Sequence, residues 1–414
     1  MNPLSIYLRF SLLLFVTFSL QAGELPERTQ CSVGFNENLV YDKIGEYREV
    51  LDQFFGPLTT LNPITCMEFH ELPCFENTSR VAVFDVGSTG IRVAVADIYP
   101  SSRKIDLLDY FKYPMEFGVH KGNAKDRIAA IGGLREAIET VYGGHGVQIK
   151  YEAVATAGFR AAGNYGHELA CLIEFMTDVH FRVIDQEEEA SLAFSAALMH
   201  HPEVRGEDVV VWDIGGGSMQ FAVQSEDGGL TMAGCRVAAR TFMEMVFRAI
   251  KSDITLDSPN PIKMGESKRA TALAKKLLTK GLAKDKDIAF DSLILEPVRK
   301  RVDAGATVFG VGGVHTYLVL GFVQAILGTK NNLYTKKDLL EVIETLVEST
   351  DDEILNLAYS SGNTKLDSPH SVVTSILLVY AAMDDMGIET VHVVPADNTD
   401  GLLARAIEGS LREE

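Results

Sequence analysis

The chain has no surplus of basic residues, with 38 Lys and Arg against 57 Asp and Glu and a net charge of −19. Such a charge excludes non-specific binding to nucleic acid or to an anionic membrane surface. Low-complexity segments and repeats of about 20–50 residues are also missing. The 414 residues are 46% hydrophobic, which is enough for large cores and predicts about two domains.

A Walker A motif is also absent, because no Gly-Lys-Ser/Thr follows any glycine-rich loop. The chain instead has two loops led by aspartate, in Val81–Ile98 (VAVFDVGSTGIRVAVADI) and Val209–Val223 (VVVWDIGGGSMQFAV). In each, an apolar strand ends in an aspartate, Asp85 or Asp213, followed by a glycine turn and a second apolar run. A single loop of this kind is as well explained by an ordinary hairpin turn as by a phosphate-binding loop. The pair favours two similar half-domains that close on one phosphate chain.

The loop composition suits phosphate and a hard cation. Glycine permits positive φ and leaves backbone N–H groups open to a phosphate. Ser88, Thr89 and Ser218 add hydroxyl donors. An aspartate at a strand end suits hydrated Mg²⁺ or Ca²⁺, since hard cations prefer oxygen ligands. These residues therefore predict a metal-bound polyphosphate ligand.

Cysteines are few. Cys66 and Cys74 flank a short segment and can close a disulfide loop in an oxidising compartment, although two unpaired thiols remain an alternative. Zinc is less favoured, because only His70 lies near them. Cys171 lies in an apolar helical stretch, which predicts a buried thiol.

The N-terminus has the pattern of a secretory signal over residues 1–23. Arg9 gives a positive start, Phe10–Leu20 an apolar core and Gln21–Gly23 a small-residue exit. The core is short for a bilayer span, which needs about 20 residues, so cleavage is favoured over an uncleaved anchor. We therefore expect a periplasmic or secreted protein. Residues 24–79 are predicted to form an N-terminal extension.

From residue 80 onward, strands alternate with helices, as in mixed α/β domains. The strand VQIKYEAVATAGFRAA is expected to end in a turn that carries Thr156 and Arg160. The predicted helices span residues 124–142, 166–178, 239–250, 264–282, 293–302, 335–349 and 371–386, with a long helix after the acidic turn at 187–189 and a terminal one after 390.

In order, the motifs DVGSTGIRV, ATAGFR, QEEEA, DIGGGSMQ, GVGG and DGLL resemble those of the actin-like phosphohydrolases, over Val81–Ile407. This superfamily includes the exopolyphosphatase and guanosine pentaphosphate phosphatase family and the apyrases. The resemblance implies an α/β fold of two actin-like (ribonuclease H-like) domains, with mixed sheets flanked by helices and an interdomain cleft. The implied domains are 80–190, with a C-terminal helix at about 402–414 packing back on it, and 191–401.

The motifs divide between two branches of the superfamily. GSTGIR, ATAGFR and Gln220 resemble the apyrase versions, whereas IDQEEEASLAF, GVGG and VVPADNTDGLL resemble those of exopolyphosphatases. The implied activity is metal-dependent hydrolysis of the terminal phosphoanhydride of inorganic polyphosphate or nucleotide polyphosphates by water. The alternatives are an apyrase acting on nucleoside tri- and diphosphates such as ATP, and a catalytically silent actin-like nucleotide-binding protein.

The acidic run Glu187–Glu189 is the expected source of the catalytic base. Like charges packed together raise each other's pKa, which tunes a carboxylate toward proton transfer. By resemblance the base is Glu189, with Glu188 as the alternative, and Ser218 and Gln220 hold the attacking water. The plain alternative is an acidic helix N-terminus stabilised by the helix dipole.

The resemblance also implies the remaining roles. Asp85 and Asp213 hold Mg²⁺ or Ca²⁺ through water, and the implied phosphate-binding residues are Gly87, Ser88, Thr89, Gly90, Thr156, Arg160, Gly215, Gly216 and Gly217. A surface salt bridge is the alternative for Arg160, and domain packing is expected for Arg92. The lysine-rich stretch Lys263–Lys286 can guide polyphosphate but is more simply a solvated helix face. The expected partner is a phosphate substrate, with no nucleic acid and no membrane after signal cleavage.

Overall fold

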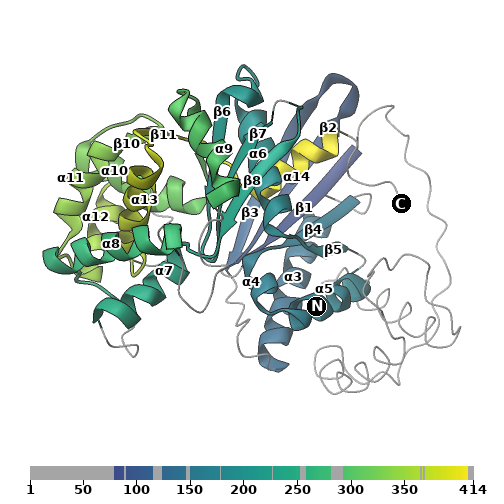
Figure 1. The fold of residues 1–414 in the computed structure, drawn as a ribbon. Helices are drawn as coiled ribbons and strands as arrows, with labels where there is room; N and C mark the ends of the chain where they lie inside the picture. The colour runs from purple at the N-terminus through teal and green to yellow at the C-terminus, as the bar shows by residue number, and fades with distance from the viewer. Residues whose placement is uncertain are drawn as a thin grey trace, which may run out of the picture.

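The computed structural model describes residues 79–87, 90–114, 124–145, 150–177, 179–225, 227–251, 258–280, 292–363, 366 and 369–408. These residues form two sheets with helices packed on them (Figure 1). The predicted signal segment, the extension before residue 79 and the Cys66–Cys74 pair lie outside the described residues. Within the described ranges, no helix has the length and apolar character needed to cross a membrane.

The first sheet has the strand order β3-β2-β1-β4-β5. Its strands are β1 (Ser79–Val86), β2 (Gly90–Tyr99), β3 (Lys104–Pro114), β4 (Lys150–Ala155) and β5 (His180–Val183). The first three form an antiparallel meander, and β4 and β5 join it in parallel. Parallel pairing requires crossover connections, and these contain α3 (Ala124–His145), α4 (Ala157–Ala161) and α5 (Asn164–Thr177).

The second sheet, ordered β10-β11-β9-β6-β7-β8, repeats this arrangement and adds one edge strand. Its strands are β6 (Val209–Ile214), β7 (Met219–Gln224), β8 (Leu230–Cys235), β9 (Thr307–Val311), β10 (Leu333–Thr335) and β11 (Thr390–Val393). Strands β6, β7 and β8 correspond to β1, β2 and β3, while β9 and β11 correspond to β4 and β5. The predicted fold of two mixed α/β halves is confirmed.

A larger helical layer covers the second sheet, at the left of Figure 1. It contains α7 (Ala239–Val246), α8 (Met264–Lys280), α9 (Ser292–Asp303), α10 (Gly321–Leu327), α11 (Lys336–Leu346), α12 (Asp351–Ser360) and α13 (Val372–Met386). Helix α13 is apolar on most of its circumference, and 12 of its 15 residues are buried. Such a helix belongs inside a domain rather than on its surface, so α13 anchors the layer.

Two helices connect the halves. Helix α6 (Gln186–His200) places Ala193 and Phe194 against the second sheet and Leu192 in a core shared with β1 and β2. Helix α14 (Asn398–Ile407) places Leu402 in that same shared core. At their crossing, a Cβ on Gly401 would lie 2.3 Å from the Leu192 carbonyl oxygen, so only glycine permits this approach. A division of the chain at residue 190 falls within α6 and stays a prediction.

Most predicted helices match the structure to within a few residues, and the differences have local causes. Helix α12 was not predicted, although Thr350 and Glu353 form a capping box at its start. The turn predicted to carry Thr156 and Arg160 is instead a short helix over Ala157–Ala161, with Thr156 at its N-cap. The prediction of a buried thiol at Cys171 is wrong, because Cys171 is disulfide-bonded and only partly buried.

Candidate active site

The two aspartates of the glycine loops occupy equivalent sheet positions. Asp85 on β1 lies opposite Arg92 on β2 and opposite Val154 on the parallel neighbour β4. Asp213 on β6 lies opposite Gln220 on β7, and its parallel neighbour is β9. Both carboxylates are buried. The repeat of strand order therefore places a buried acid at the same point of each half.

Both glycine loops meet the short helix α4. The backbone N–H of Thr156, at the start of α4, donates to the carbonyl oxygen of Val86 in the first loop at 3.3 Å. A Cβ on Gly217 in the second loop would lie 3.0 Å from the Cβ of Ala157. The predicted phosphate-binding segments of the two halves therefore adjoin at α4. Ser88 and Thr89, between Gly87 and Gly90, lie outside the described residues.

The second loop is fixed by backbone hydrogen bonds. The Gly215 N–H donates to the Ser218 carbonyl at 3.0 Å, which closes the turn. The Gly216 carbonyl accepts from the Arg240 N–H at the start of α7 at 2.9 Å. The turn thus holds Ser218 at the start of β7, two residues before Gln220. Side chains two apart on a strand share a face, as the sequence predicts for this pair.

Glu189 lies at the centre of a polar cluster with Arg160, Ser218 and Gln220. Its Oε2 atom accepts from Nη2 of Arg160 at 2.6 Å and from Nε2 of Gln220 at 3.2 Å. The Ser218 hydroxyl accepts from the same two groups, at 3.2 Å from Arg160 and 2.8 Å from Gln220. Glu189 is only 6% exposed. The structure thus brings together four of the predicted site residues, from three separate segments.

Arg160 is therefore not engaged in the surface salt bridge that was its alternative interpretation. Its side chain is 20% exposed, and Nη1 donates to the carbonyl oxygen of Ile184 at 2.9 Å, which fixes the guanidinium plane. The plane carries further N–H donors that a phosphate can use, because arginine binds phosphate through two parallel hydrogen bonds.

Two buried acceptors in this region have no hydrogen-bond donor among the described residues: Oδ1 of Asp85 and Oε1 of Gln220. A buried polar atom without a partner costs about 1–3 kcal/mol. Native structures retain such atoms mainly where a water, an ion or a substrate supplies the missing partner. The pair therefore indicates that a ligand completes this site.

Asp85 is held by an arginine between two aspartates. Nη1 of Arg92 lies 2.6 Å from Oδ2 of Asp85, and its Nε lies 3.6 Å from Oδ2 of Asp397. Burial raises the pKa of Asp85 to about 6; Arg92 opposes this, while the charges of Asp397 and Glu189 add to it. The sequence-based prediction that Arg92 serves domain packing misses this direct contact with the site.

Burial also raises the pKa of Asp213 well above its usual range, and the charges of Glu189 and Asp85 raise it further. Asp213 abuts the GVGG loop, where Gly312 has φ +92° and a Cβ would lie 2.6 Å from its Oδ1. Only glycine satisfies both conditions. This contact gives the GVGG motif a physical role that its sequence alone does not reveal.

The donor set fits a hydrated cation. Asp85 and Asp213 supply buried oxygen donors of raised pKa, and a divalent cation would favour their charged forms. The described residues contain no group of three or more His, Cys, Asp or Glu side chains placed to hold a metal directly. Two carboxylates that hold a metal through its waters match the behaviour of Mg²⁺, which keeps several waters when bound.

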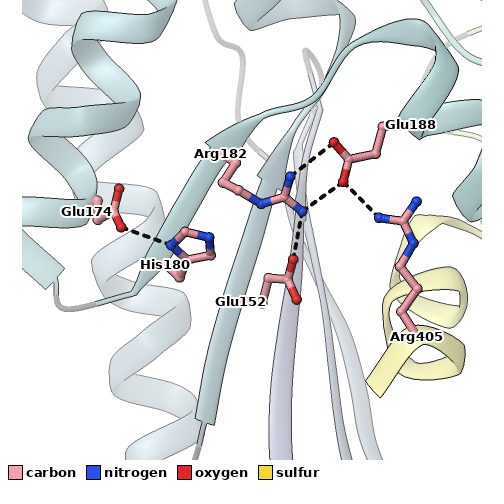
Figure 2. Close-up of polar contacts among 6 residues, drawn as sticks. All are labelled: Glu152, Glu174, His180, Arg182, Glu188 and Arg405. Atoms are coloured by element: carbon pink, nitrogen blue, oxygen red, sulfur yellow. Dashed lines mark hydrogen bonds and ion pairs between the residues drawn. The ribbon is translucent and has the colours of Figure 1, made fainter. Parts of the chain in front are cut away.

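Glu188, the alternative base, contacts none of this cluster. It accepts hydrogen bonds from Arg182 and Arg405 instead (Figure 2). Burial alone would raise its pKa, but the two arginines lower the pKa below its usual value. The expectation that neighbouring acids raise each other's pKa is therefore wrong for Glu188, because the positive charges of Arg182 and Arg405 stabilise its carboxylate. Glu187 is exposed.

The Glu189 cluster described above does not include Tyr317, Tyr359 or the lysine-rich helix α8. Tyr359 on α12 is 54% exposed, so it is a surface residue. Tyr317 follows the GVGG loop and is half-buried, with its ring 3.6 Å from the position of a Cβ on Gly313. The lysine-rich α8 buries Ala270, Ala274 and Leu277 and exposes its cationic face, as expected for a solvated amphipathic helix.

Sequence reasoning thus missed Arg92, Gly312 and Asp397 as members of the site. Arg92 had a detectable signal, since strand pairing across a tight turn places it opposite Asp85. Asp397 caps α14 through the Thr399 N–H, so its sequence signal is that of a helix cap. Nothing local in the sequence indicates its approach to Arg92, because the two residues are 305 positions apart.

The paired sheets and the buried acids at equivalent strand ends define a two-domain, actin-like fold. Residues 129–253 match the model of the Ppx/GppA phosphatase family. Residues 129–253 are thus similar to the Ppx/GppA phosphatase family, which confirms the resemblance found in the motifs of the chain. The matched region includes α4, the QEEEA segment and the second glycine loop. No curated protein matches the chain.

Solved structures share the fold over most of the chain. The Ppx/GppA family member of Aquifex aeolicus is 18% identical, with a TM-score of 0.59 over 81% of this chain and 100% of its own. An exopolyphosphatase from Cytophaga hutchinsonii is 19% identical, with a TM-score of 0.59 over 80% and 98%. A nucleoside triphosphate hydrolase from Neospora caninum is 10% identical, with a TM-score of 0.50 over 90% and 97%. At these low sequence identities, the similarity shows a shared fold and nothing further about activity.

Proposed function

We propose that this protein hydrolyses the terminal phosphoanhydride of inorganic polyphosphate or of a nucleotide polyphosphate by direct attack of water. The cluster of Glu189, Arg160, Ser218 and Gln220 is the observation that carries this proposal. Phosphoryl transfer needs positioning and charge stabilisation more than covalent chemistry. A buried carboxylate beside an arginine and two water-orienting groups supplies these needs.

Arg160 couples substrate binding to activation of the base. In the ligand-free protein its Nη2 binds both Glu189 and Ser218. A terminal phosphate would compete for these donors, since arginine binds phosphate oxygens with charge-assisted hydrogen bonds. Glu189 would then be released from its ion pair with Arg160, and its Oε2 would be open to a hydrogen bond from the attacking water. The base thus becomes effective when the substrate is in place.

The attacking water would lie between Gln220 and Glu189. The unpaired Oε1 of Gln220 can accept one proton of the water, and Glu189 can accept the other as the phosphorus–oxygen bond forms. The Ser218 oxygen already accepts from Arg160 and Gln220, so its own proton points elsewhere and can reach the water or the phosphate. The two products are inorganic phosphate and a chain one phosphate shorter.

Asp85 and Asp213 would hold Mg²⁺ or Ca²⁺ through water, with Arg92 and Asp397 fixing the orientation of Asp85. Ppx/GppA family enzymes are in general dependent on a divalent metal. When bound, such a cation neutralises charge on the phosphate oxygens. This local charge offsets the repulsion that a net charge of −19 imposes on an anionic substrate.

Export of the protein is part of the proposal. It rests on the signal pattern of residues 1–23 and gains support from the disulfide at Cys171, since disulfides persist mainly in oxidising compartments. N-terminal sequencing of the protein recovered outside the cytoplasm tests it. A mature chain that begins near Glu24 is expected, whereas a cytoplasmic chain that retains Met1 would refute export.

One assay tests the activity and identifies the substrate. The purified protein is given long-chain polyphosphate, guanosine pentaphosphate, ATP and ADP, each with Mg²⁺, Ca²⁺ or EDTA, and phosphate release is measured. We expect release from polyphosphate or guanosine pentaphosphate that EDTA abolishes. Hydrolysis of ATP and ADP without polyphosphate turnover would identify an apyrase. No release from any of the four would leave the silent nucleotide-binding protein as the remaining function.

A further inference from the structure

Next to the candidate base, four charged side chains form a network of ion pairs (Figure 2). Arg182 on β5 makes a bidentate pair with Glu188, with Nη1 to Oε2 at 3.0 Å and Nη2 to Oε1 at 2.8 Å. Its Nη2 also binds Glu152 on β4 at 2.9 Å. Arg405 on α14 approaches the same Glu188 from the other side, with Nη1 2.8 Å from Oε1. Among the described residues, the network thus contains two arginines and two glutamates.

This network differs from an ordinary surface ion pair. All four side chains are partly buried, with exposures from 13% to 34%. Isolated exposed pairs contribute little, whereas bidentate pairs in networks hold their geometry well. The network also ties the β4–β5 edge and the first turn of α6 to α14, since Arg405 lies 217 positions from Glu188 in the sequence.

Glu188 and Glu189 are consecutive in the first turn of α6. Successive residues of an α-helix are rotated by about 100°, so the two side chains point in different directions. A clamp on Glu188 therefore fixes the rotation of the turn about the helix axis, and this rotation sets the direction of Glu189. The turn is also capped by Asp185, whose Oδ1 accepts from the Glu188 N–H at 2.7 Å.

We infer that Arg182 and Arg405 are positioning residues, which hold Glu188 so that Glu189 faces Ser218 and Gln220. The inference rests on the proposed function, because it assigns Glu189 as the base. It also explains why two adjacent glutamates have separate cations. Because Glu188 is paired with Arg182 and Arg405, Glu188 does not compete with Glu189 for Arg160. Placement of a reacting group to within about 1 Å is worth about 100-fold in rate.

The test compares kinetic constants of the full-length protein and its variants on whichever phosphoanhydride the wild type hydrolyses. For Arg405→Gln we expect kcat to fall about 10- to 100-fold while KM changes less than about 3-fold, because substrate contacts are intact. Arg405→Lys should restore most of kcat, since Arg405 donates a single hydrogen bond to Glu188. Arg182→Lys should not, because an ammonium group cannot reproduce the bidentate pair.

The pH dependence provides a readout that a purely structural role would not change. In Arg405→Gln, the charge of Glu188 is less compensated and acts on Glu189, so the acidic limb of the kcat profile should move to higher pH. The matched control is Glu187→Gln, which removes an exposed carboxylate from the same turn. It should leave kcat and the acidic limb unchanged.

Variants of the network that lose thermal stability but keep kcat, KM and the acidic limb would overturn the inference. Should the arginine variants fail to fold, Glu188→Gln breaks the same clamp with little change of shape. Its kcat should also fall, but its acidic limb should move to lower pH, because the two arginines lose their counter-charge. A wild type without activity would overturn the proposed function instead. Amide hydrogen exchange over residues 186–192 then decides whether the network orders the turn, with faster exchange expected in Arg405→Gln and not in Glu187→Gln.

Discussion

Oε2 of Glu189 lies 2.6 Å from Nη2 of Arg160, although the two residues lie on different helices, α6 and α4. The same guanidinium nitrogen lies 3.2 Å from Oγ of Ser218, which follows the glycine turn of the second half. One arginine thus joins the two halves at the point where the base is expected. The first prediction concerns this base.

Glu189→Gln should keep the hydrogen bonds and remove the proton acceptor. We expect kcat to fall about 10²- to 10⁴-fold with a small change in KM, the usual contribution of a general base. Steady-state phosphate release measures both constants, and circular dichroism checks the fold. Retention of more than about a tenth of the wild-type kcat would exclude Glu189 as the base. Glu187→Gln is the control for the loss of a carboxylate.

Removal of divalent cations should destabilise the protein more at pH 7 than at pH 5. The folded pKa of Asp85 is raised to about 6 from 3.8, so the folded state binds the proton more tightly than the unfolded state. Stability from this group is therefore lost as pH rises from about 4 to 6, by about 3 kcal/mol in total. A bound cation would offset this loss.

The measurement is the melting temperature with EDTA or with Mg²⁺ at both pH values. The increase on adding Mg²⁺ should be larger at pH 7, when Asp85 must carry its charge. Monovalent salt at equal ionic strength is the control for general screening. An equal increase at both pH values, or none, would show that the aspartates do not hold the cation.

Gly312→Ala should damage both stability and activity. The residue has φ +92°, and the added methyl group would lie 2.6 Å from Oδ1 of Asp213. Gly305→Ala is a matched control, because Gly305 has φ +85° but open space at its Cβ position. We expect a cost of about 1 kcal/mol at Gly305 from the backbone alone, and about 2–4 kcal/mol at Gly312 from backbone and clash together.

Denaturant unfolding gives the two free energies, and phosphate release gives the activity. Only Gly312→Ala should lose activity, by about 10-fold or more, because it displaces Asp213. Equal effects of the two substitutions would mean that Gly312 serves the backbone turn and not the site.

His315 should make the protein sensitive to acid. It is fully buried between Trp212 and Tyr334, and its Nδ1 lies 2.6 Å from the Tyr334 hydroxyl. Burial lowers its pKa to about 3, so between pH 6.5 and 3 the unfolded state binds the additional proton and stability falls as pH falls. The loss between pH 7 and pH 5 is about 2 kcal/mol.

His315→Gln should be less stable at pH 7, because it disturbs a packed cluster, but should lose less stability between pH 7 and pH 5 than the wild type. Urea unfolding at the two pH values measures the difference. The exposed residue His392 provides a control substitution, His392→Gln. A variant with the full wild-type pH dependence would assign the acid sensitivity to other groups.

The sequence predicted the fold and much of the site because both depend on local patterns. Strand, aspartate and glycine follow one another in each half, and Ser218 and Gln220 share a face by their spacing alone. The contacts that complete the site join distant segments instead. Arg92 and Asp397 meet only after α14 returns to the first sheet, and Arg405 reaches Glu188 by the same return. No local period or turn signal encodes such a meeting.

Hydrogen-bond partners also distinguish Glu188 from Glu189, which the sequence alone does not. Glu188 and Glu189 look alike in the run QEEEA, and either can serve as a base on composition alone. Their partners distinguish them, because Glu188 faces Arg182 on β5 and Glu189 faces Arg160 on α4. A helix turns by about 100° per residue. The difference of one position therefore decides which arginine each glutamate side chain meets.

The return of α14 to β1 and β2 has a consequence for biosynthesis. Leu402, Leu403 and Ala406 share a core with Val81 and Val83, the first strand of the described chain. A ribosome makes these residues long after β1, so that core remains open until α14 has emerged. A chain that stops before residue 398 lacks the capping helix of its first sheet and the arginine beside Glu188. Termination before α14 therefore yields a polypeptide with exposed apolar surface, which quality-control proteases recognise as unfinished.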